Sequence, residues 1–353
     1  MSVPVSDSDF SAPPGQQPAD RPTTDEPAAG RSRLARLAKA AGMAIAVLAV
    51  ALCVLTLARE WSEISDALGR AKLSWLLLAL LAAAGAMTGL GLLWWRCMRV
   101  FGAEVRRRDA IAWYFSGELG KYVPGGVWSV LGRGELAARA GVARSTGYLT
   151  TLISYAAMCV AAAVVCGVLA PFVALDKTAG AGLSWGWLML ALIPLGIAAL
   201  HPAVLGRVLA FGAKLTRGRV QLQPRPWSTM LGLTGWSLAT WALVGAASVC
   251  VTEALGYSQQ PARVAFAAVA AWIIGFLAIP VPAGAGLREL VFLAISGLDS
   301  GPAVAVAAIA RLLFIVVDAG GGLFGLAAVR RPGNTASPTT APDAGALTNG
   351  SIQ

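Results

Sequence analysis

The chain has 353 residues, of which 57% are hydrophobic and 13% are charged. An ordinary soluble domain carries roughly 25% charged residues, so water is the wrong solvent for most of this chain. The formal net charge is +10, but the basic residues form short clusters between apolar runs, which argues against a basic nucleic-acid-binding stripe. The composition predicts an all-α, polytopic membrane protein that binds no nucleic acid.

The ends of the chain differ from its centre. Residues 1–38 and 331–353 are polar, rich in Pro, Ser, Thr and Ala, and lack apolar periodicity, so we expect two disordered tails. Residues 39–330 hold the apolar runs and form the predicted transmembrane domain. The first run begins near residue 40 without a convincing cleavage site after it, which predicts a retained span rather than a signal peptide.

Long apolar runs predict membrane spans, since about 20 such residues cross a bilayer. The predicted full spans are 41–58, 73–95, 146–170, 183–205, 229–251 and 302–329, which makes six. Two more apolar regions, 110–138 and 262–297, are interrupted by proline and glycine. Most of the twelve tryptophans lie near predicted span ends, as in an interfacial aromatic belt.

Basic clusters predict the orientation, because positively charged loops stay in the cytoplasm. A cluster at 31–39 precedes the first span and predicts a cytoplasmic amino terminus. The clusters at 96–108, 207–225 and 330–331 also fall in the cytoplasm if each interrupted region enters the membrane and returns as a hairpin. We therefore expect six spans, two re-entrant hairpins, cytoplasmic termini and a location in the cell membrane.

The two interrupted regions share a motif. Residues 117–126 read GELGKYVPGG and residues 275–284 read GFLAIPVPAG, with glycine at both ends and Val-Pro between. Three predicted spans separate the copies, and an odd number turns the second copy upside down. Inverted repeats of broken helices form the substrate sites of many secondary transporters.

The chemistry of the motif favours an anion. Proline removes a backbone donor and glycine tolerates unwound backbone, so VPGG and VPAG each end one half-helix and begin another. The free N–H groups of the new half-helix favour phosphate, and unpaired backbone at membrane depth must face protein or a water-filled cavity. The motifs predict a site for a lipid phosphate head group. Two ordinary kinked helices in a packed bundle are the alternative.

Charged residues at both breaks and in the last span are site candidates, because intramembrane charge is costly. Arg311 and Asp318 lie about two helical turns apart, too far for an ideal pair, and we expect Glu289 to be the partner of Arg311. The alternatives are a structural ion-pair network, a helix-dipole role for Glu289 and a solvated cytoplasmic mouth for Arg133 and Glu135. The predicted substrate-binding residues are Glu118, Lys121, Tyr122, Pro124, Gly125, Gly126, Arg133, Pro282, Gly284, Gly286, Arg288, Glu289, Arg311 and Asp318.

Metal and cofactor chemistry has little support in the sequence. The five cysteines form no CxxC pair and the chain has one histidine, so neither a disulfide framework nor a zinc site is expected. No P-loop motif indicates ATP use. We expect no cofactor and no bound metal.

Residues 117–141, GELGKYVPGGVWSVLGRGELAARAG, with PAGAGLRE at 282–289 and ARL at 310–312, resemble the membrane domain of the lysylphosphatidylglycerol synthase, or flippase-like, family. The resemblance covers roughly residues 40–330. One departure is Ala283, where the family usually has a glycine. In the synthases of that family, this domain moves aminoacylated phosphatidylglycerol between leaflets, and a separate soluble domain transfers the amino acid.

The resemblance implies a protein that translocates or handles an anionic phospholipid or a lipid-linked intermediate, with membrane lipids as its partners. We expect no aminoacyltransferase domain in this chain, so synthase activity is not carried over. The main alternative is a non-catalytic accessory subunit of a separate cell-envelope or lipid-modifying enzyme. A homo-oligomer and a separate transferase partner are left open beside the membrane lipids. A lipid-modifying enzyme is a third hypothesis, but the sequence shows no catalytic motif.

Overall fold

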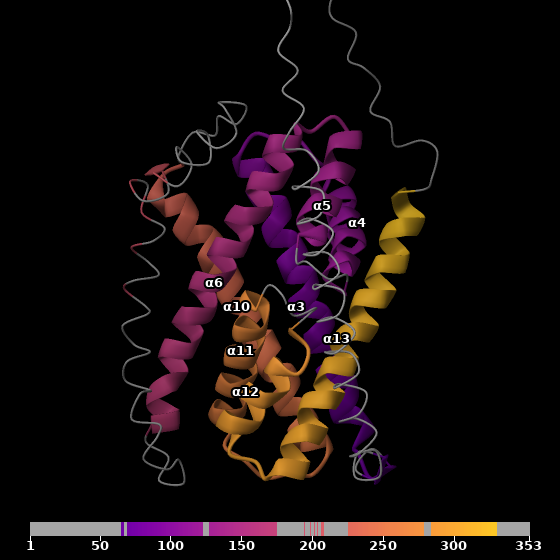
Figure 1. Cartoon of the computed structure of the whole chain (residues 1–353), viewed down its shortest axis with the longest axis vertical. Helices are drawn as coiled ribbons and strands as arrows, with labels where there is room; N and C mark the ends of the chain where they lie inside the picture. Colours follow the sequence, from indigo (N-terminus) through magenta and orange to yellow (C-terminus); the bar gives the residue numbers. More distant parts are fainter. Residues whose placement is uncertain are drawn as a thin grey trace, which may run out of the picture. The chain divides into compact units, whose positions relative to one another are not determined.

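The computed structural model describes residues 65–66, 69–122, 127–174, 225–278 and 284–329, with a few single positions between 194 and 207. This part of the chain is all-helical and contains no strand. Its eight α-helices and one 3₁₀ turn are α3 (Leu73–Val100), α4 (Arg107–Glu118), η1 (Leu119–Tyr122), α5 (Trp128–Arg139), α6 (Arg144–Ala174), α10 (Trp227–Ala254), α11 (Pro261–Leu277), α12 (Leu287–Ser296) and α13 (Ser300–Val329) (Figure 1).

Four of these helices, α3, α6, α10 and α13, are long and apolar enough to cross a membrane. They confirm the predicted spans 73–95, 146–170, 229–251 and 302–329, with ends that differ by a few residues. The predicted spans 41–58 and 183–205 lie outside the described residues, apart from isolated positions in the second. The two predicted tails also lie outside them.

The first interrupted region folds as two helices that lie side by side. α4 and η1 end at Tyr122, and α5 begins at Trp128. A β-carbon added at Gly117 would meet Arg133, and one added at Gly120 would meet Ser129. Residue numbers run in opposite directions across this contact, so the arms are antiparallel. We call α4, η1 and α5 the first hairpin.

The second interrupted region has the same form. α11 is followed by α12, and the Arg263 side chain donates to the carbonyl oxygen of Ile295 at 3.0 Å. Nearer the break, Gly275 of α11 lies against Arg288 of α12. These contacts make α11 and α12 an antiparallel pair, which we call the second hairpin. A single kinked helix, the alternative left open by the sequence, is wrong for both regions.

The two hairpins pack along different halves of α13. Leu119 of the first hairpin approaches Gly322 in the second half of that helix. Phe292 of the second hairpin shares a buried apolar cluster with Ile309 in the first half. Figure 1 accordingly shows α4 and α5 toward one end of α13, and α11 and α12 toward the other. The connecting ends of both hairpins therefore approach the middle of α13.

Close packing of α3 on α10 provides the base for this arrangement. Ala83 and Ala86 of α3 are fully buried, and Gly89 lies against Thr240. Trp236 of α10 donates its indole N–H to the carbonyl oxygen of Gly89 at 3.0 Å. Small residues allow such close approach, which drives helix association in a bilayer, where apolar burial alone contributes little.

Large apolar side chains point outward from the spanning helices. Exposed examples are Leu77 and Leu81 of α3, Phe172 of α6 and Leu323 and Phe324 of α13. Exposed apolar surface on this scale is a liability in water, whereas lipid tails solvate it. The described part of the chain therefore has the surface of a membrane protein.

Candidate functional site

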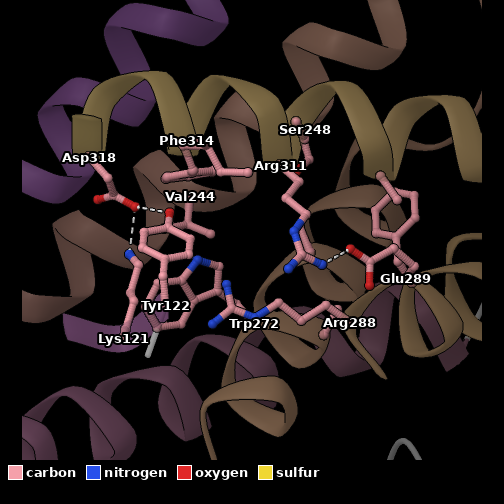
Figure 2. Close-up of a pocket in the computed structure, with 16 residues that line it drawn as sticks. Lys121, Tyr122, Val244, Ser248, Trp272, Arg288, Glu289, Arg311, Phe314 and Asp318 are labelled. Carbon is pink, nitrogen blue, oxygen red and sulfur yellow. Dashed lines mark hydrogen bonds and ion pairs between the residues drawn. The ribbon is translucent and has the colours of Figure 1, made fainter. Parts of the chain in front are cut away.

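A chain of alternating charges joins the first hairpin to α13. Glu118 pairs with Arg133 of α5 and, at 3.0 Å, with the Nζ of Lys121. Lys121 Nζ also lies 2.6 Å from Oδ2 of Asp318, and the Tyr122 hydroxyl donates to that oxygen at 2.7 Å (Figure 2). Each of these charges is buried or half-buried and has an opposite charge beside it, which offsets the cost of removing it from water.

Arg133 is a buried member of this chain. Its side chain is 1% exposed, and its guanidinium carbon lies 4.1 Å from the Tyr114 ring centroid and 5.5 Å from that of Tyr155. Aromatic faces stabilise a guanidinium that also pairs with a carboxylate. The solvated-mouth interpretation is therefore wrong for Arg133. For Glu135, whose side chain is 41% exposed and pairs with Arg144 at 3.0 Å, the solvated-mouth interpretation stays a prediction.

The motif glycines Gly117 and Gly275 pack against Arg133 and Arg288, the arginines that follow the two helix breaks. A β-carbon at Gly117 would lie 2.6 Å from Cγ of Arg133, and a β-carbon at Gly275 would overlap the side chain of Arg288. Only a residue without a β-carbon lets the two arms approach this closely. The two motif copies are therefore alike in packing: the glycine of one arm receives the arginine of the other.

Arg288 differs from Arg133 in its partners. Its guanidinium carbon lies 4.3 Å from the Trp272 ring centroid, and its Nε is buried without a hydrogen-bond acceptor. No ion pair joins Arg288 to any described residue. A poorly solvated cation without a counter-charge is costly, so an anion that reached this position would be stabilised.

Arg311 pairs with Glu289, which confirms the partner predicted from the sequence (Figure 2). Glu289 also lies in the first turn of α12, where a carboxylate complements the helix dipole, so the pairing and dipole interpretations are compatible. Its second oxygen, Oε2, is buried without a hydrogen bond, as is Oδ1 of Asp318. Both carboxylates therefore keep some capacity to accept a hydrogen bond.

The turn into α12 exposes backbone donors. Gly284 and Gly286 have φ angles of 67° and 81°, a region that L side chains rarely adopt. Gly286 stands at the N-cap of α12, where no side chain caps the helix, and Val127 stands likewise before α5. Neither N-cap residue therefore supplies a side-chain acceptor to the first amide groups of its helix, and the predicted anion site at these amide groups stays a prediction.

Two cavities lie among these groups. The α13 cavity has a volume of about 70 Å³, and its polar lining includes Tyr122, Glu289, Arg311 and Asp318 (Figure 2). The α6 cavity has a volume of about 330 Å³, and its polar lining includes Glu118, Ser129, Arg133 and Tyr155. Ligand pockets usually begin near 300 Å³, so the α6 cavity has room for a head group.

Most of the predicted site residues meet in these two cavities. Gly286 lies at the adjoining N-cap of α12, while Pro124, Gly125, Gly126 and Pro282 lie outside the described residues. The residues that line one or both cavities are Glu118, Lys121, Tyr122, Arg133, Gly284, Arg288, Glu289, Arg311 and Asp318.

Sequence reasoning missed the aromatic rings beneath the two arginines. Tyr114 and Trp272 each precede a motif glycine by three residues, close to one helical turn. That shared offset was a usable signal, but an aromatic residue in an apolar helix is more readily attributed to a membrane interface. No group of three or more His, Cys, Asp or Glu side chains that could hold a metal occurs within the described ranges.

These features define an all-helical membrane protein in which two helical hairpins bring charged groups to the middle of a spanning helix. A family model described as the lysylphosphatidylglycerol synthase TM region matches residues 40–320. The chain belongs to this family, which confirms the resemblance seen in the sequence. No curated protein matches the chain.

Proposed function

We propose that this protein translocates an anionic phospholipid, or an anionic lipid-linked intermediate, between the leaflets of the cell membrane. The observation that carries the proposal is Arg288, a cation that lines both cavities and has no ion pair with a described residue. The other cations of the site, Lys121, Arg133 and Arg311, each have a carboxylate partner. The unbalanced charge is positive, and an anionic head group would neutralise it.

The position of the site supports a path between leaflets. Arg311 and Asp318 lie on either side of the middle of α13, a helix of 30 residues that is long enough to cross a bilayer. Charges at that depth give a head group a polar route through the hydrocarbon core. In this proposal each hairpin enters the membrane from one side and returns, as in an inverted repeat, and both termini lie in the cytoplasm.

A leaflet-translocation assay in reconstituted vesicles tests the proposal. Labelled phosphatidylglycerol, phosphatidylcholine and aminoacylated phosphatidylglycerol are offered to the wild type and to a variant with Pro124, Gly125 and Gly126 all replaced by alanine. The wild type should move the anionic lipid. Continuous alanine favours one helix through the first break, so the variant should insert into membranes but lose translocation.

Protein-free vesicles and the amount of inserted protein serve as controls. Equal translocation by the wild type and the triple-alanine variant would contradict a site built on broken helices. No movement of any of the three lipids would overturn translocation of an anionic phospholipid. That result would favour the accessory-subunit alternative, which then requires a separate protein that copurifies at fixed stoichiometry.

A further inference from the structure

Trp272 of α11 carries a buried hydrogen-bond donor without an acceptor. The residue is 8% exposed, and its indole Nε1 has no hydrogen-bond partner. Buried tryptophan N–H groups usually find an acceptor, because an unsatisfied donor in a poorly solvated place costs free energy. The missing acceptor therefore requires an explanation.

The ring of Trp272 is held firmly by its neighbours. It meets the Trp241 ring edge to face at 5.3 Å and stacks on the Phe276 ring at 6.3 Å. The Arg288 guanidinium covers it at 4.3 Å, as Figure 2 shows. Paired aromatic contacts of this kind stabilise one ring orientation. The unsatisfied N–H is thus a fixed feature of the packed site.

Trp272 also occupies a particular place between the cavities. The linings of the α13 cavity and the α6 cavity have three residues in common, Lys121, Trp272 and Arg288. These side chains form the partition between the two spaces. Lys121 is engaged by Glu118 and Asp318, whereas Arg288 Nε and Trp272 Nε1 both lack an acceptor. Trp272 and Arg288, whose side chains are in contact at the partition, therefore each carry an unsatisfied hydrogen-bond donor.

We propose that Trp272 is a ligand-binding residue whose indole N–H, together with the Arg288 guanidinium, holds an anionic oxygen of the head group at the partition between the two cavities. A phosphodiester oxygen is a suitable acceptor, because it is anionic and accepts hydrogen bonds from a planar guanidinium and from a neutral N–H at once. The identity of the ligand as a lipid head group rests on the proposed function.

A binding measurement on the full chain in neutral detergent tests this role, with dihexanoyl phosphatidylglycerol as the probe. Trp272→Phe keeps an aromatic ring under Arg288 and against Phe276 but removes the N–H. Its affinity for the probe should fall about tenfold, the effect of one hydrogen bond to a charged group. Unchanged affinity in Trp272→Phe would overturn the inference.

Trp94→Phe is the matched control. Trp94 is fully buried in α3, and its Nε1 also lacks a partner, but the residue lines neither cavity. This substitution removes an unsatisfied N–H from the core and should leave the affinity for the probe unchanged. Equal weakening by Trp94→Phe and Trp272→Phe would show a general loss of packing and would also overturn the inference.

A second measurement uses the wild type alone and so does not depend on how the variants fold. Phosphatidylglycerol with a photoreactive head group is crosslinked to the protein, which is then digested with trypsin. The peptide that spans residues 264–288 contains Trp272 and ends at Arg288, and it should carry the label. Labelling that is confined to other peptides would overturn the inference.

Binding and translocation are separate readouts, so the two proposals can fail separately. Probe binding that depends on Trp272, in a protein that moves no lipid, would keep the binding site and overturn the proposed function. Translocation of anionic lipid with binding that is independent of Trp272 would keep the function and overturn this inference.

Discussion

Arg133 in the first hairpin and Arg288 in the second lie in similar surroundings. Each packs against the motif glycine of the opposite arm. Each also covers an aromatic ring that precedes this glycine by three residues, Tyr114 at 4.1 Å and Trp272 at 4.3 Å. The resemblance of the two motif copies therefore extends from the sequence to the packing around each cation.

The two arginines differ in one partner. Glu118, which pairs with Arg133, follows the first motif glycine directly. The same position of the second copy is Phe276, which stacks on Trp272 instead. The first hairpin thus supplies its own counter-charge, while the described residues of the second hairpin form no ion pair with Arg288. One substitution between the copies separates an internal ion pair from a candidate ligand site.

Loss of the first arginine should have the largest effect on stability. Arg133→Met leaves Glu118 buried with Lys121 as its remaining partner, and breaking a buried ion pair typically costs about 3 kcal/mol or more. The free energy of unfolding in detergent should fall accordingly. Arg288→Met is the matched control and should cost far less, because it removes a cation that has no ion pair with a described residue. Equal destabilisation by the two substitutions would show that the ion pair of Arg133 contributes no stability beyond that of Arg288.

A carboxylate placed in the second hairpin should abolish the difference in ion pairing between Arg133 and Arg288. Phe276→Glu puts an acidic residue at the position equivalent to Glu118, where it can pair with Arg288. Competition for this cation should slow translocation of anionic lipid roughly tenfold, comparable to the effect of Arg288→Gln. Translocation rates of anionic and zwitterionic lipids are compared in the same vesicles. If both rates fall equally in both variants, Arg288 acts through packing rather than through its charge.

Hydrophobic pattern and motif chemistry predicted much of this fold. Apolar runs of about 20 residues predict spanning helices because the bilayer fixes their length, and α3, α6, α10 and α13 follow that rule. Proline and glycine predict where α4 and α11 give way to new helices. The Glu289–Arg311 pair was also predictable, because a short connection between α12 and α13 leaves few positions for a partner.

The contacts between distant segments could not be predicted in the same way. Tyr122 and Asp318 are 196 positions apart, and hydropathy says nothing about which faces of two helices meet. Trp272 resembles any aromatic residue of an apolar helix until the fold places its ring against Arg288. Such roles depend on helix rotation and register, which are set by the packing of many small residues together.

Alanine substitutions at the motif glycines, Gly117 and Gly275, test the comparison of the two hairpins with smaller expected effects. A β-carbon at Gly117 would lie 3.0 Å from the backbone nitrogen of Arg133, so Gly117→Ala forces the two arms apart and should cost about 1–3 kcal/mol. At Gly275 the nearest atoms all belong to the Arg288 side chain and begin at its Cγ, which lies too close to the helix backbone to move away without a shift of the arm. Gly275→Ala should therefore have a similar cost in unfolding free energy and should also weaken phosphatidylglycerol binding, because it displaces the cation. Unfolding and binding are measured on both variants, and weaker binding in Gly117→Ala but not in Gly275→Ala would mean that the first hairpin, rather than the second, holds the ligand.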